Sequence, residues 1–164
     1  MDGERVSSTK KSRSKIKVML VVFFDWKGNV HHEFAPCVQM VNKQLHQEVL
    51  ARLRDAVRMK RHELWENQTW MLHHDNAPVH ASLIRSYLAK HQTSVVPHPP
   101  YSPDLAPADF FLFPKLKTTL KGRRFQTIEE SQENVIRELH AITGNAFQES
   151  FQQLKKCWER CYRQ

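Results

Sequence analysis

The sequence predicts an α/β fold in which helices flank a mixed sheet. An apolar, β-branched and aromatic run over residues 16–24 is followed by a turn containing Gly28 and a second strand pattern, and together they predict a β-hairpin. Two more short apolar strands follow, each preceded by a helical pattern. Amphipathic helices end the chain. This order of hairpin, helix, strand, helix, strand and helices is typical of one α/β layer.

A helix over about residues 43–60 is expected directly after the hairpin. Its apolar residues recur on one face at helical spacing, and Asn42 suits the N-cap. Its basic residues are expected to form a solvated face rather than a DNA contact, and they are Arg52, Arg54, Arg58 and Lys60. A buried strand over residues 69–73 comes next.

The second half of the chain continues with a helix, a strand and a proline-rich loop. Pro78 suits the first turn of a helix that runs to about His91, and a short strand over residues 93–98 follows. The stretch PPYSPDLAP at residues 99–107 holds too much proline for a helix or a central strand. It predicts a fixed loop that leads into a helix near Ala108.

Two helices are expected at the end, over about residues 128–142 and 146–162. Gly144 lies between them and is interpreted as the stop of the first helix. Trp158, in the second helix, is interpreted as a packing residue.

Length and charge predict one domain with a basic tail and a polyanionic partner. At 164 residues the chain suits a single domain over residues 16–164, preceded by a polar, disordered tail over residues 1–15. Lysine and arginine exceed aspartate and glutamate by 25 − 17 = 8. Because cationic side chains release counterions when they neutralise phosphates, this excess favours DNA.

Other partner classes find no support in the sequence. It holds no apolar run of membrane-spanning length and no secretory signal, so no membrane partner is predicted. No small-molecule substrate is predicted either. The cysteines are odd in number, and Cys157 and Cys161 lie one helical turn apart, which argues against a disulfide framework. Reduced thiols and a DNA partner predict a nuclear protein.

Two aspartates stand where a metal-dependent site is expected. Asp75 ends a buried strand, and Asp109 opens the helix behind the proline-rich loop, so both carboxylates are expected at the rim of the sheet. Carboxylates are the ligands that Mg²⁺ prefers, and paired ions can activate water and stabilise a leaving oxygen. The same residues also suit ordinary helix capping.

The sequence motifs around these aspartates resemble those of the mariner branch of the Tc1/mariner transposase superfamily. The resemblance lies in HHDNAPVH at residues 73–80 and PHPPYSPDLAPADFFLF at residues 97–113, and it extends from Val18 to the KKCWERC segment near the end. It implies a ribonuclease-H-like catalytic domain that binds Mg²⁺ or Mn²⁺ through three aspartates, nicks DNA at transposon ends and joins the freed ends to a target. Asp75 matches the second acid and Asp109 the third.

Two other aspartates compete for a place in this site. Asp104 lies in the same motif as Asp109, but it follows a proline and suits a turn. Asp25 matches the aspartate of the family's hairpin turn, where its side chain is expected to bond backbone N–H groups. The spacing between Asp75 and Asp109 is one residue shorter than the family's, and the loss is expected in the connection at residues 91–94.

The resemblance also predicts an incomplete site and sheet. The family's first acid lies on the first, central strand, upstream of the hairpin, and nothing in residues 1–17 matches it. The ribonuclease-H-like sheet is therefore expected to have a gap in its middle, and an exposed edge there would allow another chain to pair. The family's helix-turn-helix module has no match either. The expected enzyme is thus truncated and impaired.

A basic cluster behind Asp109 is the candidate DNA-binding surface. It consists of Lys115, Lys117, Lys121, Arg123 and Arg124, with a solvated face as the alternative. The histidines around Asp75 are interpreted as supporting groups rather than a zinc site, because adjacent residues of a strand such as His73 and His74 point to opposite faces.

Three hypotheses remain open from the sequence. The first is a transposase catalytic domain that binds DNA and a divalent ion, allows a homodimer, and cleaves DNA poorly. The second is a domesticated, non-catalytic DNA-binding or interaction protein. The third is the product of a decayed element with no selected role.

Overall fold

The computed structural model of the protein describes residues 19–35, 43–74, 81–99 and 102–163. Its strands are β1 (Met19–Asp25), β2 (Gly28–Ala35), β3 (Met71–His73) and β4 (Ser94–Val96). Its α-helices are α1 (Lys43–Lys60), α2 (His62–Glu66), α3 (Ala81–Lys90), α4 (Phe113–Leu120), α5 (Ile128–Ala141) and α6 (Gly144–Tyr162). A 3₁₀-helix, η1 (Pro103–Leu105), and a π-helix, η2 (Ala108–Leu112), precede α4. The predicted α/β class is confirmed.

The predicted hairpin is formed by β1 and β2. The two strands pair antiparallel from Met19 opposite Ala35 to Asp25 opposite Gly28, with an irregularity between Phe23 and Phe24. Gly28 has a φ of 131°, a conformation that side chains with a Cβ rarely adopt, and this is the physical reason for a glycine at the turn.

A second sheet is formed by β3 and β4, which pair parallel with Leu72 opposite Val95. Within the described ranges, β1 pairs only with β2 and β3 only with β4, so there are two separate two-stranded sheets. The antiparallel and parallel strand pairs of the expected mixed sheet are therefore both present. They belong to two separate sheets rather than to one.

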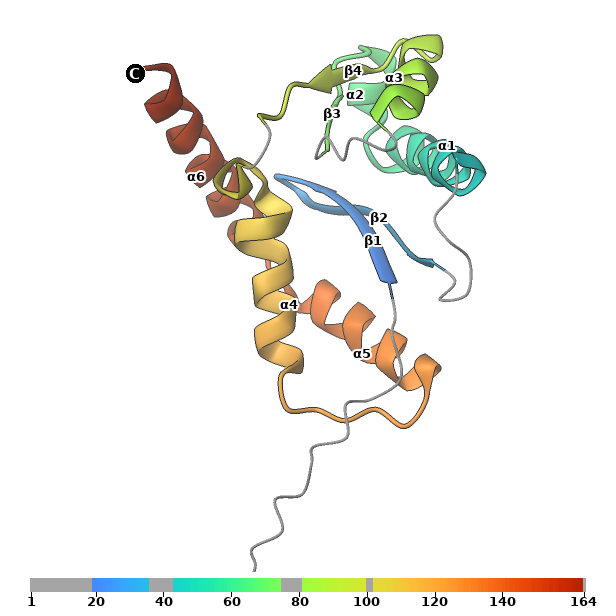
Figure 1. Cartoon of the computed structure of the whole chain (residues 1–164), viewed down its shortest axis with the longest axis vertical. Coiled ribbons are helices and arrows are strands. Elements are labelled where there is room, and N and C mark those ends of the chain that lie inside the picture. The colour runs from blue at the N-terminus through green and yellow to red at the C-terminus, as the bar shows by residue number, and fades with distance from the viewer. Residues whose placement is uncertain (1–18, 36–42, 75–80, 100–101, 164) are drawn as a thin grey trace, which may run out of the picture.

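Helices cover both faces of the hairpin. In Figure 1, α4, α5 and α6 lie on one side of it, and α1, α2 and α3 lie on the other side together with β3 and β4. One core contains Val30, Leu53 and Leu72, with Phe23 packed against it. The other contains Leu112 and Leu139 and packs against Phe24. Since neighbouring strand residues point to opposite faces, β1 contributes to both cores.

Several boundaries differ from the sequence-based expectation. The prediction that Gly144 stops a helix is wrong: Thr143 caps α6 by accepting a hydrogen bond from the Ala146 amide at 3.3 Å, and Gly144 is the first helical residue. The short helix α2 was not expected, and β3 begins at Met71 rather than at residue 69.

The basic side chains of α1, expected to form a solvated face, are only partly free of contacts with the rest of the protein. Arg52 forms two hydrogen bonds with Glu33 of β2, at 2.9 and 2.7 Å, and Arg54 lies over the Trp65 ring. Arg58 is exposed and pairs only loosely with Asp55, at 3.6 Å. The bonds from Arg52 lower the pKa of Glu33, an effect that burial partly offsets.

Several predictions fall on residues outside the described ranges, namely those for the tail, Asn42 and Pro78. Cys157 and Cys161, both on α6, are free thiols. No described helix has the length and apolar character that crossing a membrane requires.

Candidate active site

A cavity of about 580 Å³ separates the two sheets. Its walls come from β1, β3, α1 and the η2 region, together with Phe151 of α6. The lining is mainly apolar, and its titratable side chains are Asp25, Arg61, His73, His74 and Asp109. This size falls within the range of ligand-binding sites in proteins.

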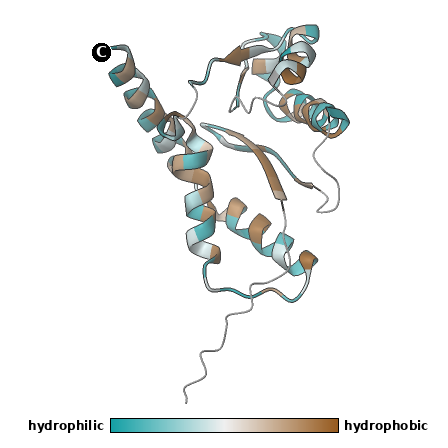
Figure 2. Ribbon diagram, viewed as in Figure 1, coloured by the Kyte–Doolittle hydropathy of each residue, from teal (hydrophilic) through white to brown (hydrophobic). Residues whose placement is uncertain are grey.

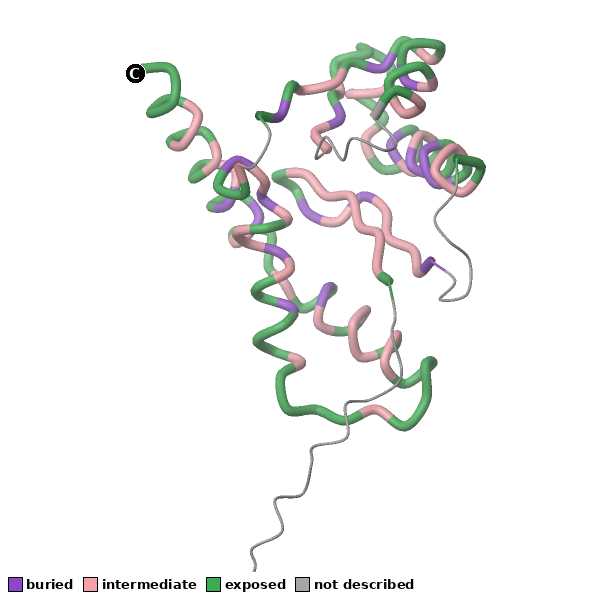
Figure 3. The backbone as a smooth tube through the Cα atoms, in the orientation of Figure 1, coloured by how far each residue is buried: buried purple, intermediate pink, exposed green. Residues whose placement is uncertain are grey.

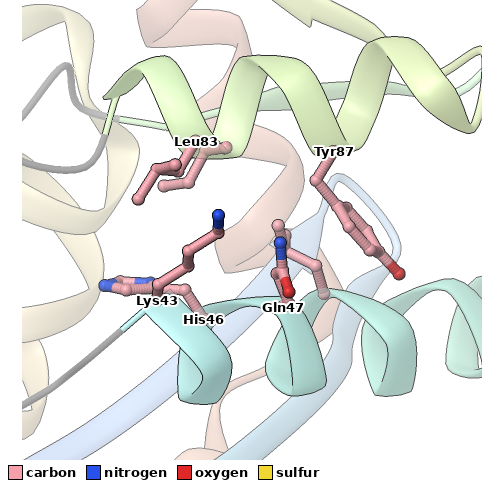
Figure 4. A pocket seen from close by; sticks show the side chains of 7 residues that line it. Lys43, His46, Gln47, Leu83 and Tyr87 are labelled. Carbon is pink, nitrogen blue, oxygen red and sulfur yellow. The ribbon is translucent and has the colours of Figure 1, made fainter.

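A crevice between α1 and α3 is far smaller. It is lined by Lys43, His46, Gln47, Leu83 and Tyr87, among others, as Figure 4 shows, and its volume is about 10 Å³. That volume is at the lower limit for one water molecule, so the crevice offers no room for a substrate.

Asp109 lies at the rim of the large cavity. It is exposed and stands in the first turn of η2, after the buried Pro107 and the partly buried Ala108. Its amide donates to the Ala106 carbonyl at 2.9 Å, which fixes the backbone that carries the carboxylate. Proline at the start of the helix limits the conformations of this turn. Asp109 is therefore a held but accessible carboxylate.

The competing acid, Asp104, lies elsewhere. It belongs to η1, is exposed, and does not line the cavity. The Leu105 amide donates to the Ser102 carbonyl at 3.1 Å, so Asp104 sits in a closed turn, as its position after Pro103 suggested.

Asp75 itself lies outside the described residues. The two residues before it, His73 and His74, line the same cavity as Asp109. The end of β3 and the start of η2 therefore line one cavity, while the position of Asp75 itself stays a prediction.

His73, which lines the cavity and is half-buried, pairs with the buried His98. His73 Nε2 and His98 Nδ1 are 2.9 Å apart, and burial, followed by the charge of His98, lowers the pKa of His73. No group of three potential metal ligands occurs among the residues that the structure describes.

Asp25 also lines the cavity, and both of its carboxylate oxygens accept hydrogen bonds. Its Oδ1 accepts from the amides of Lys27 at 2.9 Å and Gly28 at 3.0 Å, which confirms the expected turn role. Arg61 adds two bonds, Nε to Oδ2 at 2.6 Å and Nη2 to Oδ1 at 2.9 Å. These bonds to Asp25 are also the main cause that raises the pKa of Arg61.

Arg61 is a residue that the sequence gave no reason to select. It lies between α1 and α2 and reaches the hairpin turn, 36 positions earlier in the chain. A lone arginine after a helix has no motif, and only the unexpected turn into α2 places it beside Asp25.

The basic cluster follows Asp109 along one continuous helical segment. Lys115 and Lys117 are exposed on α4, while Lys121, Arg123 and Arg124 are exposed in the turn after it. Since a helix rises about 1.5 Å per residue, Lys121 lies roughly 18 Å along the axis from Asp109. Figure 1 shows α4 extending away from β3 and β4.

Two members of the cluster have partners on the protein. Arg123 lies 3.4 Å from Glu138 Oε1 and from Asn134 Oδ1, both on α5. Lys115 lies over the Phe111 ring at 5.6 Å. Within the described part of the chain, Lys117, Lys121 and Arg124 have no ion pair or hydrogen bond from their side chains, and they are the members best placed to meet a phosphate.

Comparison with known proteins gives a consistent result. Residues 2–67 match the family model described as a transposase, partial DDE domain. The chain is 32% identical to the Mariner Mos1 transposase of Drosophila mauritiana over 162 residues, which is 97% of this chain and 47% of that protein. It is 26% identical to the human histone-lysine N-methyltransferase SETMAR, of which it covers 21%. The chain thus spans about half or less of these curated relatives.

The fold agrees with solved structures of the same relative. The Mos1 transposase catalytic domain, solved with raltegravir and Mg, has a TM-score of 0.81 at 32% identity, and the match covers 88% of this chain and 73% of that one. The Mos1 mariner paired end complex with Mn has a TM-score of 0.84 at 31% identity, covering 97% of this chain and 47% of that one. The chain belongs to the mariner family of DNA transposases, in the region that forms their catalytic domain.

Proposed function

We propose that this chain binds DNA along α4 and holds a divalent metal ion, Mg²⁺ or Mn²⁺, at Asp75 and Asp109, as part of a metal-dependent strand-cleavage site. The observation that carries the proposal is the position of Asp109. An exposed carboxylate stands at the rim of a cavity next to the residues that precede Asp75, and a basic helix begins in the same segment.

The side chains present suit a hard cation in part. Asp109 makes no ion pair or side-chain hydrogen bond with another described residue, so its oxygens are available to a ligand. Solved structures of Mos1 contain Mg or Mn. A bound ion of this kind would supply the positive charge that stabilises the attacking and leaving oxygens of a phosphodiester.

Efficient cleavage is not expected from the residues that the structure describes. Besides Asp109, the only described carboxylate that lines the cavity is Asp25. Two N–H groups of Arg61 and two backbone amides already bond to Asp25. Releasing it would leave the guanidinium of Arg61 without its charge partner, which is costly in a half-buried place. Two carboxylates therefore support ion binding better than catalysis.

The DNA surface is tested by removing charge from α4 and the turn after it. A Lys117→Ala/Lys121→Ala/Arg124→Ala variant should bind duplex DNA more weakly at low salt. Because each lost phosphate contact reduces the slope of log K against log salt by about 0.9, the slope should fall by roughly two to three. Fluorescence anisotropy over a salt series measures both quantities.

A matched variant controls for net charge. Lys155→Ala/Lys156→Ala/Arg160→Ala removes three exposed charges from α6 instead. It should retain the salt slope of the unaltered chain. Equal losses in the two triple variants would show that total charge, and not α4, governs binding.

The metal site is tested by titrating Mn²⁺ and by incubating the protein with supercoiled plasmid. Asp75→Ala and Asp109→Ala should each abolish Mn²⁺ binding measured by calorimetry, whereas Asp104→Ala should leave it unchanged. Nicking by the unaltered chain should remain close to the background of the two variants. Strong nicking that both variants lose would show that two carboxylates suffice for cleavage.

A non-catalytic binding protein is the second candidate. The observation in its favour is the open cavity between two unconnected sheets, which offers surface for a partner. DNA binding with no response to Mn²⁺ would favour it. For either function we propose a nuclear location and a homodimer on DNA, which a fluorescent fusion and light scattering of the complex would test.

A further inference from the structure

The sequence of β1 is typical of a fully buried strand, but the strand is not fully buried. Residues 19–24, MLVVFF, are apolar without alternation, a pattern typical of strands that are covered on both faces and lie inside a sheet. None of these residues is buried: Met19 is exposed and the rest are intermediate, as Figure 3 shows. Figure 2 shows the apolar character of the same strand. The described residues therefore leave β1 less covered than its sequence predicts.

The missing cover lies on the side of the cavity. Residues 22–25 of β1 and 71–73 of β3 all line it, whereas β2 contributes only Val30 and β4 contributes nothing. Among the described residues, each of the two lining strands has a neighbour on one edge only. The remaining edges of β1 and β3 therefore border the same space, and each carries backbone N–H and C=O groups suited to another strand.

The space between these edges is bounded above and below by apolar side chains. Leu53 and Val57 of α1 lie on the face of the hairpin to which Phe23 points. Phe151 of α6 lies on the opposite face, where it contacts Phe24 edge to face, with ring centroids 6.0 Å apart. A segment in this space would thus have apolar neighbours on both faces and strand edges on both sides.

Charge in the cavity limits what can occupy it. Asp25 and Arg61 neutralise each other through two hydrogen bonds. The other charged side chain in the lining is Asp109, which is exposed at the rim. The interior thus offers no net charge to attract a polyanion, and an uncharged, apolar occupant suits it.

We propose that this cavity binds one extended, apolar polypeptide segment of another protein, which pairs with β1 on one side and β3 on the other and joins the two sheets into one. A helix or a small apolar molecule would fill the volume but leave both strand edges without backbone partners. An extended segment satisfies both edges and buries apolar side chains on both faces, as in other cases of strand addition. The inference requires neither the metal nor the DNA of the proposed function.

The test uses the whole chain, without DNA and with EDTA, and a synthetic peptide, Lys-Lys-Val-Ile-Val-Thr-Val-Lys-Lys. Hydrogen exchange followed by mass spectrometry should show at least tenfold slower exchange in residues 19–25 and 71–73 together. The matched control peptide carries proline in place of the central valine. Because proline lacks an N–H and disrupts a central strand, this peptide should bind at least tenfold more weakly.

A variant of the chain provides a second comparison. Ala106→Phe places a large side chain at the wall of the cavity and should weaken peptide binding at least tenfold, with circular dichroism used to check that it folds. Protection confined to residues 28–35, equal binding of the two peptides, or protection that appears in a dimer without any peptide would each overturn the proposal.

Discussion

Two carboxylates border the same cavity, and their surroundings are opposite. Asp25, at the hairpin end, accepts four hydrogen bonds, two from backbone amides and two from Arg61. Asp109, in the first turn of η2, is exposed and bonds to no other described side chain. The side chain of Arg61 is 14% exposed and that of Asp25 is 23% exposed, so their contact is shielded from water.

This difference distinguishes an aspartate that stabilises the fold from one that is available to bind a ligand. A carboxylate whose oxygens are all bonded holds two parts of the chain together and has little capacity left for a ligand. A carboxylate on a fixed backbone with free oxygens adds little stability and can bind a cation. The two aspartates should therefore respond in opposite ways when they are replaced.

The largest loss of stability is expected from breaking the Asp25–Arg61 ion pair. Arg61→Ala should lower the free energy of unfolding by about 2 to 3 kcal/mol, because it leaves a shielded charge without its partner. Asp25→Ala should cost a similar amount, since it also removes the acceptor of two turn amides. Urea denaturation of each variant measures the effect.

A double variant and a surface control sharpen this expectation. Asp25→Ala/Arg61→Ala should cost clearly less than the sum of the two single changes, because each single change already breaks the pair. Arg58→Ala, which removes an exposed pair, should cost less than about 0.5 kcal/mol. Additive losses at Asp25 and Arg61 would mean that the two side chains act independently.

Much of the fold could be predicted because its signals are local. The hairpin, α1, β4 and the last two helices follow from apolar periodicity and turn residues. The start of α6 was missed because glycine between two helices is usually a stop, and the cap formed by Thr143 depends on geometry that the pattern does not encode. The helix α2 has five residues and no buried side chain, so it leaves no apolar pattern to detect.

The candidate site could be predicted only in part. The resemblance to the family pointed to Asp109 and to the turn role of Asp25. Arg61 could not be found, because its contact with Asp25 joins distant parts of the chain through a change of direction after α1. The roles of Asp75 and Asp109 in metal binding remain predictions.

A smaller loss of stability is expected when the pH is lowered enough to protonate His32 in the unfolded chain. Burial, followed by the charge of His140, lowers the pKa of His32 on β2 below its ordinary value of about 6.5. Between the lowered pKa and 6.5 the unfolded chain binds more protons, so stability is complete above pH 6.5 and declines as the pH falls below it. Thermal unfolding from pH 7.5 to 5 should show this decline.

The matched variant is His32→Gln, which should reduce the decline, whereas His62→Gln should not. His62 is exposed on α2, with 68% of its side chain accessible, and lies far along the chain from β2. The same pH dependence in His32→Gln as in the unaltered chain would assign the effect to other groups.

The smallest effect on stability is expected at Asp109. Asp109→Asn keeps the shape of the side chain and breaks no contact with another described residue, so the free energy of unfolding should change by less than about 0.5 kcal/mol. The same change removes an anionic ligand, and Mn²⁺ should no longer raise the thermal midpoint of the variant as it does that of the unaltered chain. A loss of stability comparable to that of Arg61→Ala would show that Asp109 is structural, and the contrast between the two aspartates would fail.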